Sequence, residues 1–373
     1  MQNSMPKPIK ITKKKVKEIL KKLKRSGTYR FPFVDLYIYA GYRLIDLIEN
    51  EHVVHYDELM YRFCEVGPGN RRFDPLTVDI LINSDIYRKY FEKSAIKRKD
   101  QWFHKESGGL DIQFFKIKEK IFKVIKENSE SKKLFELLKN TLEAIFEACG
   151  YTTESFLINE NNKYLDFKLK SKKLGGELLL RFYNTNDRIY PDSWQLWDLF
   201  QKAHKEDCIP VLIASRIHGS CFPLFKALGI FARVTYCLFT DQSAEEIKNT
   251  VLNEDEKRLF SFKNISLCKI NSMPGGSGNP VFEGVKQLLE VVVPGYFEAF
   301  KLRFDKTTKK IAPLLDGQFK YLLGSESSNL RTSERISRIE NILTLKIGHL
   351  NIIRDLVKRH KNLNNKVGLL LKD

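Results

Sequence analysis

Asp166 and Lys168 are residues whose types and spacing could support a reaction. They stand in the segment YLDFKLK, whose alternation predicts a strand with both side chains on one face. A carboxylate is a hard oxygen ligand for a divalent cation, and displacement at phosphorus requires such ligands together with a nearby cation. The alternative is a surface hairpin carboxylate that pairs with Lys168 or Arg181 and contributes little to stability.

The segments around this pair predict a definite succession of elements. Ser131 to Cys149 predicts an amphipathic helix that ends at Gly150. Three strands separated by turns follow in SFLIN, KYLDFKLKS and GELLLRFYN. A helix in PDSWQLWDLFQKAHKED then leads to an apolar strand in CIPVLIASRI. The last two elements are a short helix in CFPLFKALGIF and a strand in ARVTYCLFT. This order predicts an α/β fold with a mixed sheet and helices on both faces.

The order helix, three strands, helix, strand, over about Ser131 to Thr240, resembles the core of the PD-(D/E)XK nuclease superfamily, the restriction-endonuclease-like fold. The resemblance implies a Glu from the first helix, an Asp from the second strand and Glu-x-Lys from the third, with the acids holding Mg²⁺ against the scissile phosphate. On this mapping Asp166 takes the place of the Asp. Arg181 and Tyr183 fall where the family has its Glu and Lys.

Two substitutes could complete the site that the resemblance implies. Asp166 and Lys168 form a D-x-K that Glu147 or Glu154 could join, and Glu177 could enter from the start of the third strand. The implied catalytic set is Asp166, Lys168, Glu147 and Glu177. Within this set Asp166 and Glu147 are the expected ligands of Mg²⁺.

An excess of positive charge points to a polyanionic partner. The 373 residues include 64 Lys+Arg against 46 Asp+Glu, a net charge of +18, and lysines that neutralise phosphates release counterions. The residues from Lys7 to Arg30 are densely basic with the single acid Glu18, which predicts a basic amphipathic arm. A helix packed on the body, or lysines that serve only solubility, are the alternatives.

Residues 31–115 predict a small helical module that could form a winged helix-turn-helix. Its third helix carries Arg88, and the basic run that follows would lie near the wing. A scaffold or dimer contact is the rival interpretation. In the core, the resemblance places Arg216 and His218 near the site. The nucleic-acid-binding candidates are Lys13, Lys14, Lys15, Lys21, Lys22, Arg88, Lys97, Arg98, Lys99, Arg181, Arg216 and His218.

The remaining features limit the class of protein. Six scattered cysteines without a CxxC pair predict free thiols and a cytoplasmic protein without structural zinc. No window approaches the roughly 18 to 20 apolar residues of a membrane helix, and no secretory signal is recognisable. Ser333 to Lys358 predicts a long helix that could join two copies in a homodimer or pack on its own body.

The expected organisation is a basic arm (1–30), a winged-helix-like module (31–115), a nuclease-like α/β core (116–270) and a helical C-terminal region (271–373). The favoured function is binding of double-stranded DNA in restriction, defence or DNA processing, with Mg²⁺-dependent hydrolysis of phosphodiester bonds. The alternative is a catalytically inactive nuclease-like protein that binds DNA or serves as a partner subunit.

Overall fold

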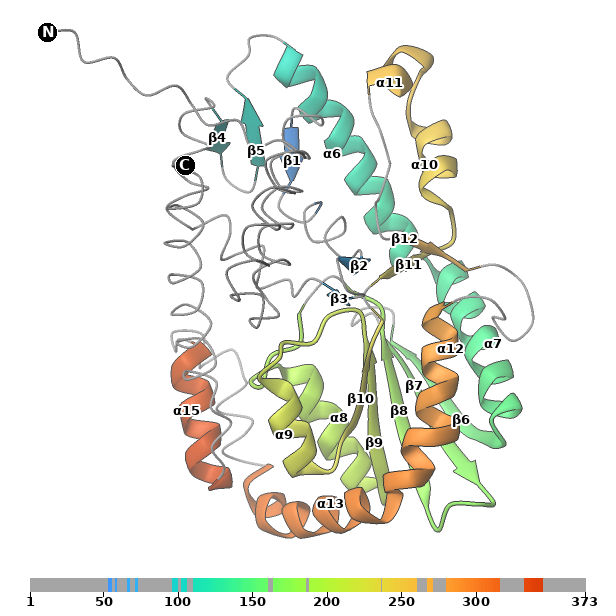
Figure 1. Cartoon of the computed structure of the whole chain (residues 1–373), viewed down its shortest axis with the longest axis vertical. Helices are drawn as coiled ribbons and strands as arrows, with labels where there is room; N and C mark the ends of the chain where they lie inside the picture. The colour runs from blue at the N-terminus through green and yellow to red at the C-terminus, as the bar shows by residue number, and fades with distance from the viewer. Residues whose placement is uncertain are drawn as a thin grey trace, which may run out of the picture. The chain divides into compact units, whose positions relative to one another are not determined.

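The computed structural model describes residues 53–55, 58, 66–67, 71–72, 96–99, 102–105, 110–159, 164–185, 188–235, 237–259, 267–270, 280–315 and 332–344 (Figure 1). The chain divides into two compact units. Unit 1 comprises Met1–Ile125, Ser243–Leu267 and Ile353–Asp373, and unit 2 comprises Lys126–Gln242 and Cys268–Ile352. Among the helices so described, none is both long and apolar enough to cross a membrane.

Unit 2 is built on a five-stranded mixed sheet in the order β10-β9-β8-β7-β6. The strands are β6 (Tyr151–Asn159), β7 (Tyr164–Ser171), β8 (Glu177–Tyr183), β9 (Cys208–Ala214) and β10 (Phe231–Val234). β6, β7 and β8 form an antiparallel meander, and β8, β9 and β10 run parallel. The predicted α/β fold with a mixed sheet is therefore confirmed.

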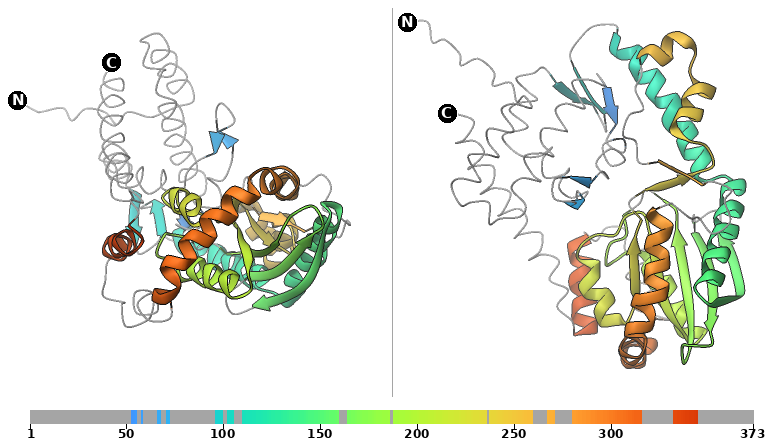
Figure 2. Two further views of the ribbon diagram at one scale, coloured as in Figure 1. Left: turned by 90° about the horizontal axis from the view of Figure 1, so that it is seen from below. Right: turned by 45° about the vertical axis from the view of Figure 1, so that its right-hand side comes forward.

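Helices cover both faces of this sheet (Figures 1 and 2). From α7 (Lys132–Ala148), the ring of Phe146 packs edge-on against Phe167 of β7, with centroids 5.0 Å apart. From α8 (Trp194–Lys205), Lys202 reaches Asp166, the neighbour of Phe167 on β7. Neighbouring residues of a strand point to opposite faces, so α7 and α8 lie on opposite sides of the sheet.

The predicted single strand ARVTYCLFT is instead two strands. β10 ends at Val234, and β11 (Leu238–Thr240) pairs with β12 (Leu267–Lys269) in a separate two-stranded sheet. Between β9 and β10 lies α9 (Cys221–Leu228), which ends at Gly229 with a left-handed φ of 73°.

The proline in PVFEGVKQLLEVVVPGYFEAFKLRF predicts two helices broken at Pro294, and this prediction is wrong. α12 (Pro280–Gln287) passes through a π-helical turn, η4 (Leu288–Val292), directly into α13 (Val293–Leu315). Proline has no N–H to donate, and the wider turn before it lets the helix continue. Along α13, Phe300 stacks on Phe231 at 4.2 Å and Phe304 packs edge-on against Phe200 of α8 at 5.1 Å.

The last described helix, α15, spans Thr332–Leu343. It confirms the start of the long C-terminal helix predicted from Ser333. The helix ends at Leu343, because Thr344 lies in a turn with a left-handed φ of 51°, so one unbroken helix to Lys358 is wrong at this point. Residues 345–358 lie outside the described residues.

Unit 1 contains a three-stranded antiparallel sheet in the order β1-β5-β4. Its strands are β1 (Val53–His55), β4 (Ile96–Lys99) and β5 (Trp102–Lys105). The sequence predicts a glycine-tipped hairpin in which Trp102 and Phe103 lead through SGG into an apolar strand DIQFF, and this prediction is wrong. The hairpin in the structure joins β4 to β5, ahead of SGG, and DIQFF belongs to helix α6 (Leu110–Ser129). On this helix Lys118 donates to both oxygens of Glu58, at 2.7 and 2.9 Å, and both side chains are buried.

Four further short elements belong to unit 1 by their residues. They are α10 (Ala244–Val251), α11 (Glu254–Leu259) and a pair of two-residue strands, β2 (Val66–Gly67) with β3 (Arg71–Arg72). The basic arm lies outside the described residues. The module predicted for 31–115 would contain three helices, at 34–49, 55–63 and 76–91. The first and third lie outside the described residues, and the predicted start of the second, His55, instead belongs to strand β1.

Candidate functional site

Asp166 of β7 and Arg181 of β8 are direct partners across the antiparallel pair. The Nε of Arg181 donates to Oδ1 of Asp166 at 2.7 Å, and its Nη2 donates to Oδ2 at 2.8 Å. The side chain of Arg181 is 0% exposed and that of Asp166 is 1% exposed. The two hydrogen bonds thus make a buried bidentate pair, the strongest geometry for these two groups.

One face of α8 completes this cluster. The helix begins after Ser193, and residues three and four positions apart on it lie on the same side. From that side the carbonyl of Gln195 accepts from Nη1 of Arg181 at 3.0 Å, and Asp198 meets Nη2 at 2.7 Å. Lys202 donates to Oδ2 of Asp166 at 3.0 Å. Two carboxylates therefore face two cations, and the cluster is electrically balanced.

The aromatic ring of Tyr164, the first residue of β7, closes one side of the cluster. The guanidinium carbon of Arg181 lies 3.8 Å from the ring centroid of Tyr164, within the range of a cation–π interaction. Burial by itself would lower the pKa of Arg181, but the hydrogen bonds to Asp166 and the charges of Asp166 and Asp198 raise it above its ordinary value. Burial also raises the pKa of Tyr164. Arg181 is therefore a permanent cation with its donors engaged.

Lys168 and Glu177 belong to a second, more exposed set of ion pairs. Lys168 meets Glu177 at 2.9 Å, and Lys170 meets Glu177 at 3.4 Å and Glu154 at 3.2 Å. The hydrogen bond from Lys168 is the largest influence that lowers the pKa of Glu177, and it raises the pKa of Lys168 in return. Asp166 and Lys168 share a face of β7 as predicted, but they bind different partners.

The predicted metal ligands do not converge. Both oxygens of Asp166 accept from cations, and Glu177 is bound by two lysines. Glu147 is exposed on α7, across the sheet from Asp166. Mg²⁺ requires several hard oxygen ligands in octahedral geometry, and these carboxylates do not fit it. Nowhere in the described part of the chain do three or more Asp, Glu, His or Cys residues form a group that could hold a metal.

The predicted basic contacts at the end of β9 are buried. Arg216 is 7% exposed and His218 is 3% exposed. The Nδ1 of His218 accepts the backbone N–H of Ser220 at 3.2 Å and lies 2.6 Å from its hydroxyl, and the imidazole stacks on Tyr190. Together with the buried Arg181, these side chains offer no surface to a phosphate in this arrangement.

The remaining predicted nucleic-acid contacts are not described at the level of side chains. Lys97, Arg98 and Lys99 form most of strand β4, and nothing further is described of them. The others lie outside the described residues; they are Lys13, Lys14, Lys15, Lys21, Lys22 and Arg88.

Two contributors to the cluster, Asp198 and Lys202, are not among the site residues predicted from the sequence. The available signal was their i, i+4 spacing on a helix adjacent to the sheet.

A comparison of the chain with protein-family models, curated proteins and solved structures finds no match.

Proposed function

We propose that this chain is a DNA-binding protein whose restriction-endonuclease-like core has lost metal-dependent cleavage. The order of helix, antiparallel meander, helix and parallel strand in unit 2 supports the relation to that fold. The net charge of +18 supports a nucleic-acid partner. The relation to the nuclease fold is tested by cleavage, and the nucleic-acid partner is tested by binding.

One observation carries the loss of cleavage. A nuclease of this class would hold its metal between an Asp of the second strand and a Glu of the third, at the positions of Asp166 and Arg181. Here the same two positions form a closed ion pair with 2.7 and 2.8 Å hydrogen bonds. Arg181 cannot coordinate a metal cation, and its hydrogen bonds engage both oxygens of Asp166, the carboxylate that could do so.

The test is a binding and cleavage series with the full-length chain. Gel shifts on duplex DNA, single-stranded DNA and RNA should be run with Mg²⁺, with Mn²⁺ and with a chelator. We expect binding of duplex DNA in every condition, a steep loss of affinity with salt, and no cleavage. Substitution of Lys13, Lys14 and Lys15 by Gln should reduce the salt slope by about three.

Glu177→Gln serves as the control for catalysis, because Glu177 is accessible and its substitution leaves the buried pair intact. Cleavage that needs Mg²⁺ and disappears in Glu177→Gln, with unchanged thermal unfolding, would contradict the proposal and restore the nuclease. Negligible affinity for every nucleic acid would contradict DNA binding.

The edge strand β6 favours a second candidate function, that of a partner subunit. β6 is the last strand of its sheet on one side, and its Phe156 and Leu157 are each 46% exposed. Unpaired edge groups beside apolar side chains are a template for strand addition by another protein. Under this candidate Phe156→Lys abolishes co-purification of a partner and leaves DNA affinity unchanged.

A further inference from the structure

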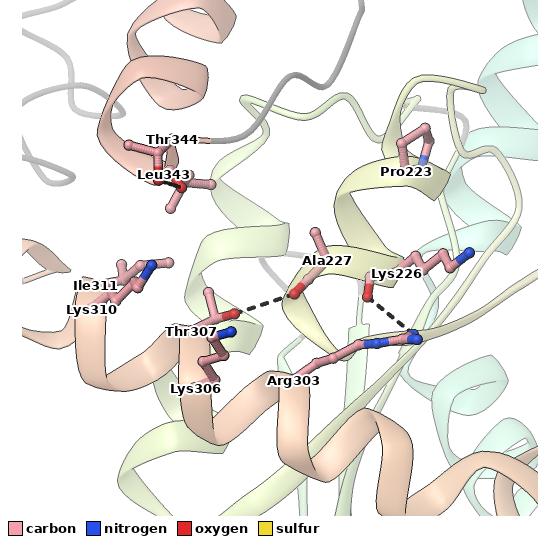
Figure 3. Close-up of a pocket in the computed structure, with 10 residues that line it drawn as sticks. All are labelled: Pro223, Lys226, Ala227, Arg303, Lys306, Thr307, Lys310, Ile311, Leu343 and Thr344. Carbon is pink, nitrogen blue, oxygen red and sulfur yellow. Dashed lines mark hydrogen bonds between the residues drawn. The ribbon is translucent and has the colours of Figure 1, made fainter.

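A cavity of about 500 Å³ lies in unit 2 between α9, the middle of α13 and the last residues of α15 (Figure 3). This volume is typical of sites for small ligands. Among the described residues, its lining includes four cationic side chains and no carboxylate; the cations are Lys226, Arg303, Lys306 and Lys310. The cavity therefore concentrates positive charge in a space that a small molecule can enter.

No carboxylate of the described residues lies within 4.0 Å of any of these four cations as an ion-pair partner. Arg303, Lys306 and Lys310 follow one another at spacings of three and four along α13, which places them on one face of the helix. Lys226 is contributed by α9. Like charges gathered in this way repel one another, and a bound anion would relieve the repulsion.

Two hydrogen bonds hold the cationic wall in place (Figure 3). The hydroxyl of Thr307 donates to the carbonyl of Ala227 at 3.2 Å, and Nη1 of Arg303 donates to the carbonyl of Lys226 at 3.5 Å. A cation at the C-terminal end of a helix such as α9 is stabilising by itself, which accounts for Arg303. It does not account for Lys306 and Lys310, whose side chains line the same cavity.

The rest of the lining is largely apolar. Leu343 of α15 and Pro223 of α9 lie across the cavity from α13, whereas Ile311 lies beside Lys310 on α13 itself (Figure 3). Ala227 adds aliphatic surface from α9. Simple inorganic anions would use only the cationic wall. A ligand that uses both walls needs a charged end and a flat or apolar end.

We propose that this cavity binds a free nucleotide, with its di- or triphosphate on the cationic wall and its base and sugar against the apolar wall. A diester in a strand brings one charge per nucleotide, whereas a di- or triphosphate concentrates several charges in the volume of one nucleotide, which suits four neighbouring cations. The site lies outside the Asp166–Arg181 cluster and goes beyond DNA binding as a function.

Calorimetric titration of the full-length chain with ATP tests the proposal, with inorganic phosphate, adenosine and a single-stranded oligonucleotide as comparison ligands. We expect ATP to bind at least tenfold more tightly than phosphate or adenosine. Lys306→Gln combined with Lys310→Gln should weaken ATP binding at least tenfold. The matched control is Lys172→Gln with Lys173→Gln, which removes the same charge from an exposed turn and should leave the affinity unchanged.

Thermal unfolding verifies that both double variants are folded. Equal weakening in the two double variants would show non-specific attraction by net charge and overturn the proposal. Binding of the oligonucleotide but not of ATP, weakened by Lys306→Gln combined with Lys310→Gln, would assign the cavity to a strand and overturn the proposal as well. Absence of ATP binding would also overturn it. Gel shifts on duplex DNA remain a separate readout, so failure here is distinguishable from failure of the proposed DNA binding.

Discussion

Asp166 and Arg181 stand opposite each other on β7 and β8, and each is the principal means by which the other's charge is stabilised away from water. Burial of an ion is costly, and only good geometry with further hydrogen bonds offsets the cost. Gln195, Asp198 and Lys202 supply these further bonds. The pair is therefore a structural element of the sheet, and its energetics can be measured.

Removal of either partner should strongly destabilise unit 2. Arg181→Ala leaves the buried Asp166 with Lys202 alone, and we expect the free energy of unfolding to fall by about 3–5 kcal/mol. The combination Arg181→Met with Asp166→Leu leaves no buried charge at these positions and should recover most of the loss. Urea unfolding monitored by the fluorescence of the buried Trp197 measures both effects.

Asp198→Ala is the control for this comparison, because Asp198 is 44% exposed and water can replace it. Its expected cost is about 1 kcal/mol. A loss in Arg181→Ala no greater than that in Asp198→Ala would mean that the buried pair contributes nothing beyond a surface contact.

Glu177→Gln should change stability by less than about 1 kcal/mol at neutral pH, since its partners Lys168 and Lys170 are part-exposed. The hydrogen bond from Lys168 lowers the pKa of Glu177 below 4.5. The stabilisation from this ion pair is therefore complete above pH 4.5, and it is lost as the pH falls through the lowered pKa of Glu177. In thermal unfolding from pH 3 to 7, the melting temperatures of the wild type and of Glu177→Gln should converge at acid pH. A constant difference across this range would refute the assignment.

Gly229 and Gly150 make a matched pair of substitutions. Both have a left-handed backbone, with φ of 73° and 81°. A Cβ on Gly229 would collide with the carbonyl oxygen of Phe300 and lie 2.8 Å from the amide of Phe304, whereas a Cβ on Gly150 meets no atom within 4 Å. Gly150→Ala should cost about 1 kcal/mol from the backbone alone. Gly229→Ala should cost about 1–3 kcal/mol more, measured by urea unfolding. Equal costs would show that α13 does not approach Gly229 so closely.

The thiol of Cys208 should make unit 2 sensitive to alkali. Burial raises the pKa of Cys208 from 9.0 to about 12. Between these values the unfolded chain loses its proton and the folded chain keeps it, so stability falls as pH rises above 9. Unfolding of the wild type should weaken more between pH 8 and 10.5 than that of Cys208→Ala. Parallel curves would mean that the thiol titrates alike in both states.

The fold of unit 2 could be predicted from the sequence because its signals are local. The alternation in YLDFKLK, the apolar run CIPVLIASRI and the amphipathic period from Ser131 to Cys149 each report their own element. Two predictions failed because the conformation depends on the residues around the segment. At Pro294 a π-helical turn just before the proline lets the helix continue. The segment DIQFF forms the first turns of the longer helix α6.

The site was less predictable because it depends on register and on distant partners. Asp166 and Arg181 were recognised as possible partners, but only the register of β7 with β8 places them directly opposite. The sequence alone could not show that α8 would place Lys202 over the same carboxylate. The cavity at α13 also escaped notice, since Lys226 joins its three cations from a segment far away in the chain.

The division of unit 2 into Lys126–Gln242 and Cys268–Ile352 has a consequence for synthesis on the ribosome. All five strands of the sheet emerge before α13, which supplies the rings of Phe300 and Phe304 that cover Phe231 and Phe200. A nascent chain that ends near Gln242 therefore presents two large aromatic rings, those of Phe200 and Phe231, to solvent or to a chaperone. These rings are covered only after translation has passed Phe304, so this part of the core is completed late in synthesis.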